Sequence, residues 1–170
     1  MDLLGCYQTA NHIHLIGAKR ARDYNGSMKF VGINEMNIEA TRFASTLKPS
    51  TKCAIIVALE GDLGAGKTTF ARAVARHFGV EENVTSPTFV IEKMYKTENG
   101  PFARLIHIDA YRLKTAHELD VLGWQEIIAE TSNLVLIEWP ERVLGAVPAH
   151  AITIKFAFVD EGVREIIYAA

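Results

Sequence analysis

The hydrophobic and polar positions of the chain predict an alternation of strands and helices. Residues 53–59 and 134–137 are continuously apolar, which is typical of strands buried on both faces of a parallel sheet. Residues 88–97 and 152–158 instead alternate, and between the strands apolar residues recur at helical spacing. The predicted elements, in order, are a strand at 29–33, a helix at 36–47, a strand at 53–59, a helix from Lys67 to Phe78, strands at 88–97 and 103–109, a helix at 115–130, a strand at 133–138, a short helical stretch after Pro140, and strands at 152–158 and 164–168.

Local signals mark the ends of these elements. Pro49 and Gly79 follow two of the predicted helices, and Thr115 with Glu118 has the spacing of a capping box. Residues 160–162 form a turn between the last two strands. This order of elements predicts a three-layer α/β fold, with a mixed, mainly parallel sheet and a C-terminal antiparallel hairpin.

The length of 170 residues predicts one domain, at residues 28–170. Residues 1–27 have neither helical nor strand periodicity and end in a turn-like string, so we interpret them as a loosely ordered N-terminal extension. An arm packed on the domain is the alternative.

The composition of the chain excludes several classes of protein. With 49% hydrophobic and 22% charged residues the chain is not disordered, and a net charge of −2 gives no overall attraction to nucleic acid or anionic membrane. No segment reaches the roughly 18–20 apolar residues of a membrane span, and the N-terminus does not fit a secretory signal. Cys6 and Cys53 are too few for a disulfide framework. We therefore expect a cytoplasmic protein with reduced thiols and no membrane partner.

The candidate chemistry begins with residues 61–68, which match the pattern G-x-x-x-x-G-K-[ST] between a strand and a helix. Backbone N–H groups of such a loop bind phosphate oxygens, Lys67 adds a positive charge, and the Thr68 hydroxyl can bind Mg²⁺. Thr69 is either a second hydroxyl near the α-phosphate or an ordinary helix residue. The alternative, a glycine-rich turn without a ligand, fits the context poorly, so we predict binding of a nucleoside triphosphate.

Two acidic residues follow predicted strands and would emerge at the same sheet edge. Asp109 and Glu138 can supply a metal ligand and a group that positions or deprotonates the attacking water, and the residues alone do not assign which is which. Solvated carboxylates are the alternative.

Three further features are considered for the site. Residues 85–89 are rich in hydroxyls and form either a loop that senses the γ-phosphate or a simple connection to a strand. His107 is interpreted as a packed core residue. Trp139 is either a hydrophobic anchor or a stacking platform.

Four blocks occur in order: 61–69 (GDLGAGKTT), 86–89 (SPTF), 107–113 (HIDAYRL) and 137–141 (IEWPE). Together they resemble the TsaE (formerly YjeE) family, the bacterial P-loop ATPases of tRNA threonylcarbamoyladenosine synthesis. The resemblance covers about residues 28–158 and implies a P-loop NTPase fold.

The resemblance also implies site residues and cofactors, ATP and Mg²⁺. The catalytic residues would be Lys67, Asp109 and Glu138, with Thr68 and Glu138 as Mg²⁺ ligands and Asp109 orienting water. The nucleotide would be bound by Gly61, Gly64, Ala65, Gly66, Lys67, Thr68 and Thr69, with Thr85 in the nucleotide-sensing loop, Trp139 close to the nucleotide and Asn37 at the edge that meets the adenine.

The implied partners are the TsaB and TsaD proteins, which modify adenosine 37 of tRNAs reading ANN codons, with ATP hydrolysis resetting the TsaD complex between turnovers. Contact with tRNA would be indirect, because no basic stripe with interleaved aromatic residues appears. Two alternatives stay open. A small-molecule P-loop kinase would need an Arg-bearing lid, and only Arg104 and Arg112 lie between Gly100 and Glu138. A nucleotide-gated interaction module would not need turnover.

Overall fold

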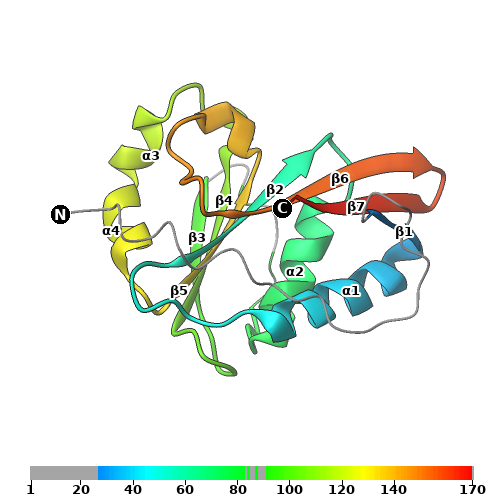
Figure 1. Cartoon of the computed structure of the whole chain (residues 1–170), viewed down its shortest axis with the longest axis horizontal. Coiled ribbons are helices and arrows are strands. Elements are labelled where there is room, and N and C mark those ends of the chain that lie inside the picture. The colour runs from blue at the N-terminus through cyan, green and yellow to red at the C-terminus, as the bar shows by residue number, and fades with distance from the viewer. Residues whose placement is uncertain (1–26, 83, 85–86, 88–90, 170) are drawn as a thin grey trace.

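The computed structural model describes residues 27–82, 84, 87 and 91–169, which form one seven-stranded sheet with helices on both faces (Figure 1). The strand order is β1-β7-β6-β2-β5-β4-β3. The elements are β1 (Ser27–Val31), α1 (Gly32–Thr46), β2 (Ile55–Gly61), α2 (Lys67–His77), β3 (Glu92–Lys96), β4 (Arg104–Asp109), the 3-10 helix η2 (Ala110–Arg112), α3 (His117–Val121), α4 (Trp124–Ala129), β5 (Asn133–Glu138), the 3-10 helix η3 (Pro140–Val143), β6 (Ile152–Asp160) and β7 (Val163–Ala169).

The sheet is mixed, as the sequence predicts. The four central strands, β6, β2, β5 and β4, are parallel to one another, and β1, β7 and β3 pair antiparallel at the two sides. The C-terminal hairpin is formed by β6 and β7. Parallel strands place their carboxyl ends at one sheet edge, where α/β folds bind ligands.

Two buried clusters occupy the two faces of the sheet, which makes the fold three-layered. The first contains Phe43 of α1, Phe70 of α2 and Phe156 of β6. The second contains Trp124 of α4 and Ile137 of β5. Figure 1 accordingly shows α1 and α2 together on one side of the sheet and α3 and α4 on the other.

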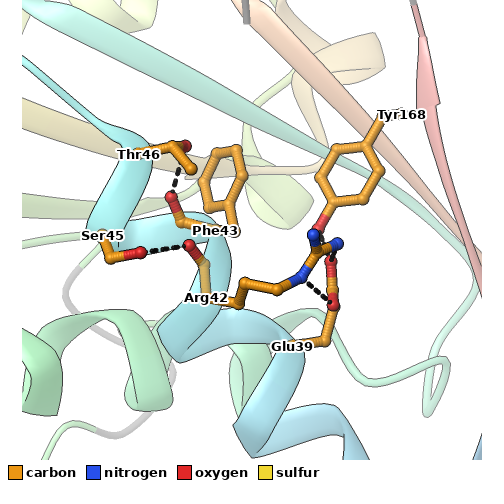
Figure 2. A network of polar contacts seen from close by, with 6 residues as sticks. All are labelled: Glu39, Arg42, Phe43, Ser45, Thr46 and Tyr168. Carbon is orange, nitrogen blue, oxygen red and sulfur yellow. Dashed lines mark hydrogen bonds and ion pairs between the residues drawn. The ribbon is translucent and has the colours of Figure 1, made fainter. Parts of the chain in front are cut away.

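A polar network fixes α1 to the last strand (Figure 2). Glu39 is buried and accepts two hydrogen bonds from Arg42, at 2.8 Å from Nε and 2.6 Å from Nη2. The Tyr168 hydroxyl of β7 donates to Glu39 Oε1 at 2.8 Å, and its ring stacks on Phe43 with centroids 5.6 Å apart. Glu39 raises the pKa of Arg42 above its ordinary value. The charge on buried Glu39 is thus compensated, which such burial requires.

The prediction of one helix at 115–130 is wrong. The segment forms α3 and α4, separated at Gly123, whose φ of +76° is left-handed and cannot continue a helix. One of the two hydrogen bonds of the predicted capping box is present, because the Glu118 side chain accepts the Thr115 N–H at 2.9 Å.

The strand predicted at 88–97 is shorter in the structure. β3 begins at Glu92, and Ile91 has a φ of +67°, which is not extended. The first strand and helix also begin earlier than predicted, so that Ile33 lies in α1.

The predicted extension at 1–27 lies outside the described residues except for Ser27, which begins β1. Cys6 also lies outside them, and the thiol of Cys53 is buried with its Sγ 3.5 Å from His150 Nε2. Within the described part of the chain, no helix combines the length and apolarity that crossing a membrane requires.

Candidate functional site

The glycine-rich loop connects the end of β2 to the start of α2, as predicted. Gly61 has a φ of +135°, and a Cβ there would lie 2.2 Å from the carbonyl oxygen of Phe156 on the neighbouring strand. Gly64 has a φ of +78°, and no atom of the described residues lies within 4 Å of its Cβ position. The loop therefore needs glycine at Gly61 for space as well as conformation, whereas at Gly64 only the conformation requires it.

Lys67 lies under the loop and is only 4% exposed. Its Nζ donates to the carbonyl oxygens of Gly61 at 2.6 Å and Asp62 at 2.8 Å, and it lies 3.8 Å from the ring centroid of Trp139. Burial lowers the pKa of Lys67, although nearby carboxylates, above all Glu138, oppose the shift. The ammonium is thus held against the carbonyl groups of the loop, with the Trp139 ring beside it.

Glu138 lies beside the loop as the last residue of β5 and is 2% exposed. Its Oε2 accepts a hydrogen bond from Thr68 Oγ1 at 3.0 Å. Its Oε1 lies 2.9 Å from Nε2 of His107, which is fully buried. The structure therefore brings the two predicted Mg²⁺ ligands, Thr68 and Glu138, into direct contact.

Asp109 is the last residue of β4 and pairs in register with Glu138. It is 3% exposed, and its Oδ1 accepts the Tyr111 N–H at 3.0 Å. Paired residues of neighbouring strands share a face of the sheet. Both acidic residues therefore lie on the face that carries α2, at the edge where the loop begins.

Trp139 directly follows Glu138 in a left-handed conformation, with a φ of +59°. Its N–H donates to the Leu59 carbonyl at 3.2 Å, and its ring lies 5.0 Å from that of Tyr111. Left-handed backbone costs a bulky residue free energy and is concentrated at functional sites. The Trp139 ring contacts Lys67 and Tyr111 beside the phosphate loop, and the choice between an anchor and a stacking platform stays a prediction.

The remaining residues predicted for the nucleotide site lie in or near the loop and α1, or outside the described residues. Ala65 is buried in the loop, and Gly66 precedes α2 close to the Met36 side chain. Thr69 is half-buried in the first turn of α2, and Asn37 is half-buried in α1, one residue after Met36. Thr85 lies outside the described residues.

Two contacts at the site are not predicted by the sequence. His107 is fully buried, as the core interpretation predicts, and it also contacts Glu138; its position two residues before Asp109 on one strand places it on the same face, which is a usable signal. Arg164 of β7 donates from Nε to the Gly64 carbonyl at 3.3 Å. No motif marks Arg164, because this contact joins residues 100 positions apart.

The donor set fits a magnesium nucleotide. A hydroxyl oxygen and a carboxylate oxygen are hard ligands, and Mg²⁺ in nucleotide sites is bound by one or two such groups together with phosphate oxygens. The loop's open Gly64 and its buried Lys67 suit the phosphates.

Comparisons with known proteins agree with one another. Residues 34–166 match the family model described as "Threonylcarbamoyl adenosine biosynthesis protein TsaE", and this match extends beyond residue 158 into β7. The chain is similar to a tRNA threonylcarbamoyladenosine biosynthesis protein TsaE of Rickettsia felis, with 40% identity over 127 residues that cover 74% of this chain and 71% of that protein. A protein of the same name from Treponema pallidum is 38% identical over 114 residues, 67% of this chain and 81% of that protein.

A solved structure is also similar. The crystal structure of YdiB from Bacillus subtilis superposes with a TM-score of 0.68 at 30% sequence identity, covering 85% of this chain and 84% of YdiB.

Proposed function

The chain belongs to the TsaE family, and we propose that it binds ATP with Mg²⁺ and hydrolyses it in the synthesis of threonylcarbamoyladenosine on tRNA. The observation that carries this proposal is the Thr68–Glu138 hydrogen bond beside a complete phosphate-binding loop. It joins the two side chains that a magnesium triphosphate would need, close enough to Lys67 for the Glu138 charge to act on its ammonium.

The loop binds the phosphates through its backbone. N–H groups of the loop and of the first turn of α2 would bind the phosphate oxygens, and the helix N-terminus would favour their negative charge. Lys67 meets the β and γ oxygens. Bound phosphate would also compensate the cost of burying this ammonium, the cost that lowers its pKa.

Thr68 and Glu138 hold the magnesium ion in this proposal. When bound, Mg²⁺ neutralises charge that develops on the β and γ oxygens. Glu138 is oriented for this role from both sides, by Thr68 at one oxygen and His107 at the other.

Asp109 orients the attacking water and accepts its proton as the bond between the γ-phosphorus and the β–γ bridging oxygen breaks. The hydrogen bond from the Tyr111 N–H fixes the direction of the Asp109 carboxylate. Asp109 and Glu138 are adjacent in register, so the two carboxylates can divide water and metal between them.

In the cell this activity would act in the cytoplasm with the TsaB and TsaD proteins, which place threonylcarbamoyl on adenosine 37 of tRNAs reading ANN codons. Hydrolysis would reset the TsaD complex between turnovers, and tRNA would be met only through that complex.

The test is ATP hydrolysis by the purified chain, with and without purified TsaB–TsaD. We expect weak hydrolysis alone and a clear increase with the pair. A rate of ATP hydrolysis that does not change when TsaB–TsaD is added would contradict the pathway assignment and favour a small-molecule kinase. A screen of phosphate acceptors would then test the kinase alternative.

A further inference from the structure

Two residues of the described chain, apart from glycines, have a left-handed backbone, and each adjoins one acidic residue of the site. Trp139 directly follows Glu138. Ile91, with a φ of +67°, accepts the Asp109 N–H on its carbonyl oxygen at 2.8 Å. For a β-branched residue this conformation is rare and costs free energy, and residues strained in this way cluster at active sites. The surroundings of Ile91 show what this strain does.

The left-handed backbone changes the face of the sheet on which the Ile91 side chain lies. Glu92 is opposite Ile108 in the antiparallel pairing of β3 with β4. The next pair outward is therefore Ile91 with Asp109. In a regular strand Ile91 would share the face of Asp109, the α2 face, on which Tyr95 of β3 is buried. Its side chain instead packs on the buried cluster of the opposite face, away from the Asp109 carboxylate.

The backbone of Ile91 also holds the end of β4. In a regular antiparallel pair Ile91 would both accept a hydrogen bond from Asp109 and donate one to it. Here the Ile91 N–H donates to the Pro87 carbonyl at 2.6 Å, and the Ile91 carbonyl accepts from Asp109. The Asp109 backbone is thus held by Ile91 on one side and by the pairing with Glu138 of β5 on the other. These contacts oppose fraying at the last residue of β4, whose backbone sets the direction of its side chain.

We propose that Ile91 is a positioning residue for Asp109, because its left-handed backbone holds the Asp109 carboxylate in the orientation that hydrolysis requires. This inference rests on the proposed role of Asp109 in ATP hydrolysis and adds the residue through which Asp109 is held. Burial of the Ile91 side chain in the opposite cluster offsets the free energy of the strained backbone. A shorter side chain at this position would remove that compensation.

Replacement of Ile91 by alanine and by glycine separates this role from simple packing. Alanine loses the buried contacts and keeps the cost of left-handed backbone, so Ile91→Ala should relax to an extended conformation and release Asp109. Glycine adopts the left-handed conformation without that cost, so Ile91→Gly should keep Asp109 in place. The kcat for ATP hydrolysis by the whole chain should fall by roughly 10- to 100-fold in Ile91→Ala and stay close to the wild-type value in Ile91→Gly. The KM for ATP should be nearly unchanged in both, because neither variant touches the phosphate loop.

Two measurements on the folded protein should follow the same order. In urea unfolding, the ratio of folded to unfolded protein should be roughly 5- to 30-fold higher for Ile91→Gly than for Ile91→Ala. Hydrogen exchange should show the Asp109 amide protected in the wild type and in Ile91→Gly, and exchanging faster in Ile91→Ala. Packing alone predicts the opposite order, because glycine retains even less of the side chain than alanine.

The matched control is Ile55, the first residue of β2, which is partly buried like Ile91 but does not have a left-handed backbone. It lies at the opposite end of β2 from Gly61 and the phosphate loop. Ile55→Gly should be less stable than Ile55→Ala, and both should keep the wild-type kcat. Ile91→Val keeps a β-branched side chain for the buried cluster, so it should restore most of the kcat that Ile91→Ala loses.

A kcat that is as low in Ile91→Gly as in Ile91→Ala would overturn the proposal, because only the packed side chain would then matter. Wild-type kcat with an equally protected Asp109 amide in Ile91→Ala would also overturn it. If Ile91→Ala does not fold, a folded Ile91→Gly with wild-type kcat supports the proposal, and an unfolded Ile91→Gly overturns it. A wild-type chain that binds ATP without hydrolysing it would instead contradict the proposed function. The order of stability and the Asp109 amide would then still decide whether Ile91 holds Asp109.

Discussion

The Thr68 hydroxyl and the Glu138 carboxylate lie 3.0 Å apart although 70 positions separate them in the sequence. They meet because β2 and β5 are neighbouring parallel strands, which deliver the phosphate loop and Glu138 to the same edge. This contact defines the metal end of the proposed site, and the mutations below are chosen around it.

Glu138→Gln should separate metal binding from nucleotide binding. The substitution keeps the shape of the side chain and removes the charge that the metal needs, so hydrolysis should fall by at least about 100-fold. ATP without Mg²⁺ should bind no more weakly than to the wild type, because a buried negative charge near the phosphates is gone. Calorimetry with and without Mg²⁺ checks both expectations. Wild-type hydrolysis by this variant would exclude Glu138 as a metal ligand.

His107 should act as a positioning residue for Glu138. Within the described residues its Nδ1 is buried without a hydrogen-bond partner, whereas its Nε2 lies 2.9 Å from Glu138 Oε1, to which it donates. His107→Leu removes this donor and should raise the Mg²⁺ concentration for half-maximal ATP binding by roughly 10- to 100-fold. His107→Gln, which keeps an N–H donor, should recover part of the loss. If His107→Leu lowers the melting temperature without changing the Mg²⁺ dependence, the residue is only structural.

Gly61→Ala and Gly64→Ala form a matched pair. The added methyl group at Gly61 meets the Phe156 carbonyl, whereas at Gly64 it meets nothing. Gly64→Ala should therefore lower the free energy of unfolding by about 1–2 kcal/mol, the cost of left-handed backbone alone. Gly61→Ala should lose clearly more or fail to fold. Urea unfolding measures the difference, and equal losses would contradict the close approach of β6.

Glu92 should give the stability a measurable pH dependence. Burial raises its pKa above the ordinary 4.5, and its Oε2 has no hydrogen-bond partner among the residues that the structure describes. Because the pKa of Glu92 is higher in the folded state than in the unfolded state, the folded state loses stability as the pH rises from the unfolded pKa through the folded pKa. Glu92→Gln removes the ionisation, so it should be more stable than the wild type at pH 8, with the advantage shrinking toward pH 4. Urea unfolding of both proteins across this range tests the sign, and a difference independent of pH would contradict it.

Strands with strong local patterns could be predicted from the sequence. Residues 134–137 are continuously apolar, and the strand predicted at 133–138 matches β5 as observed. The helix predicted at 115–130 failed because apolar spacing continues across Gly123, where the backbone turns left-handed and ends α3. A hydrophobic pattern does not record a backbone conformation of this kind.

Some features of the candidate site could likewise be predicted from the sequence, and others could not. The loop and the two acidic strand ends follow from motif and topology, since parallel strands bring their carboxyl ends together. The contact of Arg164 with Gly64 does not follow, because it depends on how far the β6–β7 hairpin extends past β2. Only the fold reveals that a residue near the C-terminus reaches the phosphate loop.

The most direct test of the central claim is the number of threonylcarbamoyladenosine products formed per TsaD molecule, measured with TsaB–TsaD, tRNA, ATP and either the wild-type chain or Asp109→Asn. Asparagine keeps an oxygen that can accept the Tyr111 N–H, so ATP binding should persist while hydrolysis falls by roughly 10²- to 10⁴-fold. The account predicts several products per TsaD with the wild type and about one with Asp109→Asn. Equal yields from a variant confirmed to bind ATP without hydrolysing it would contradict the claim, and would make the chain a nucleotide-gated partner that needs no turnover.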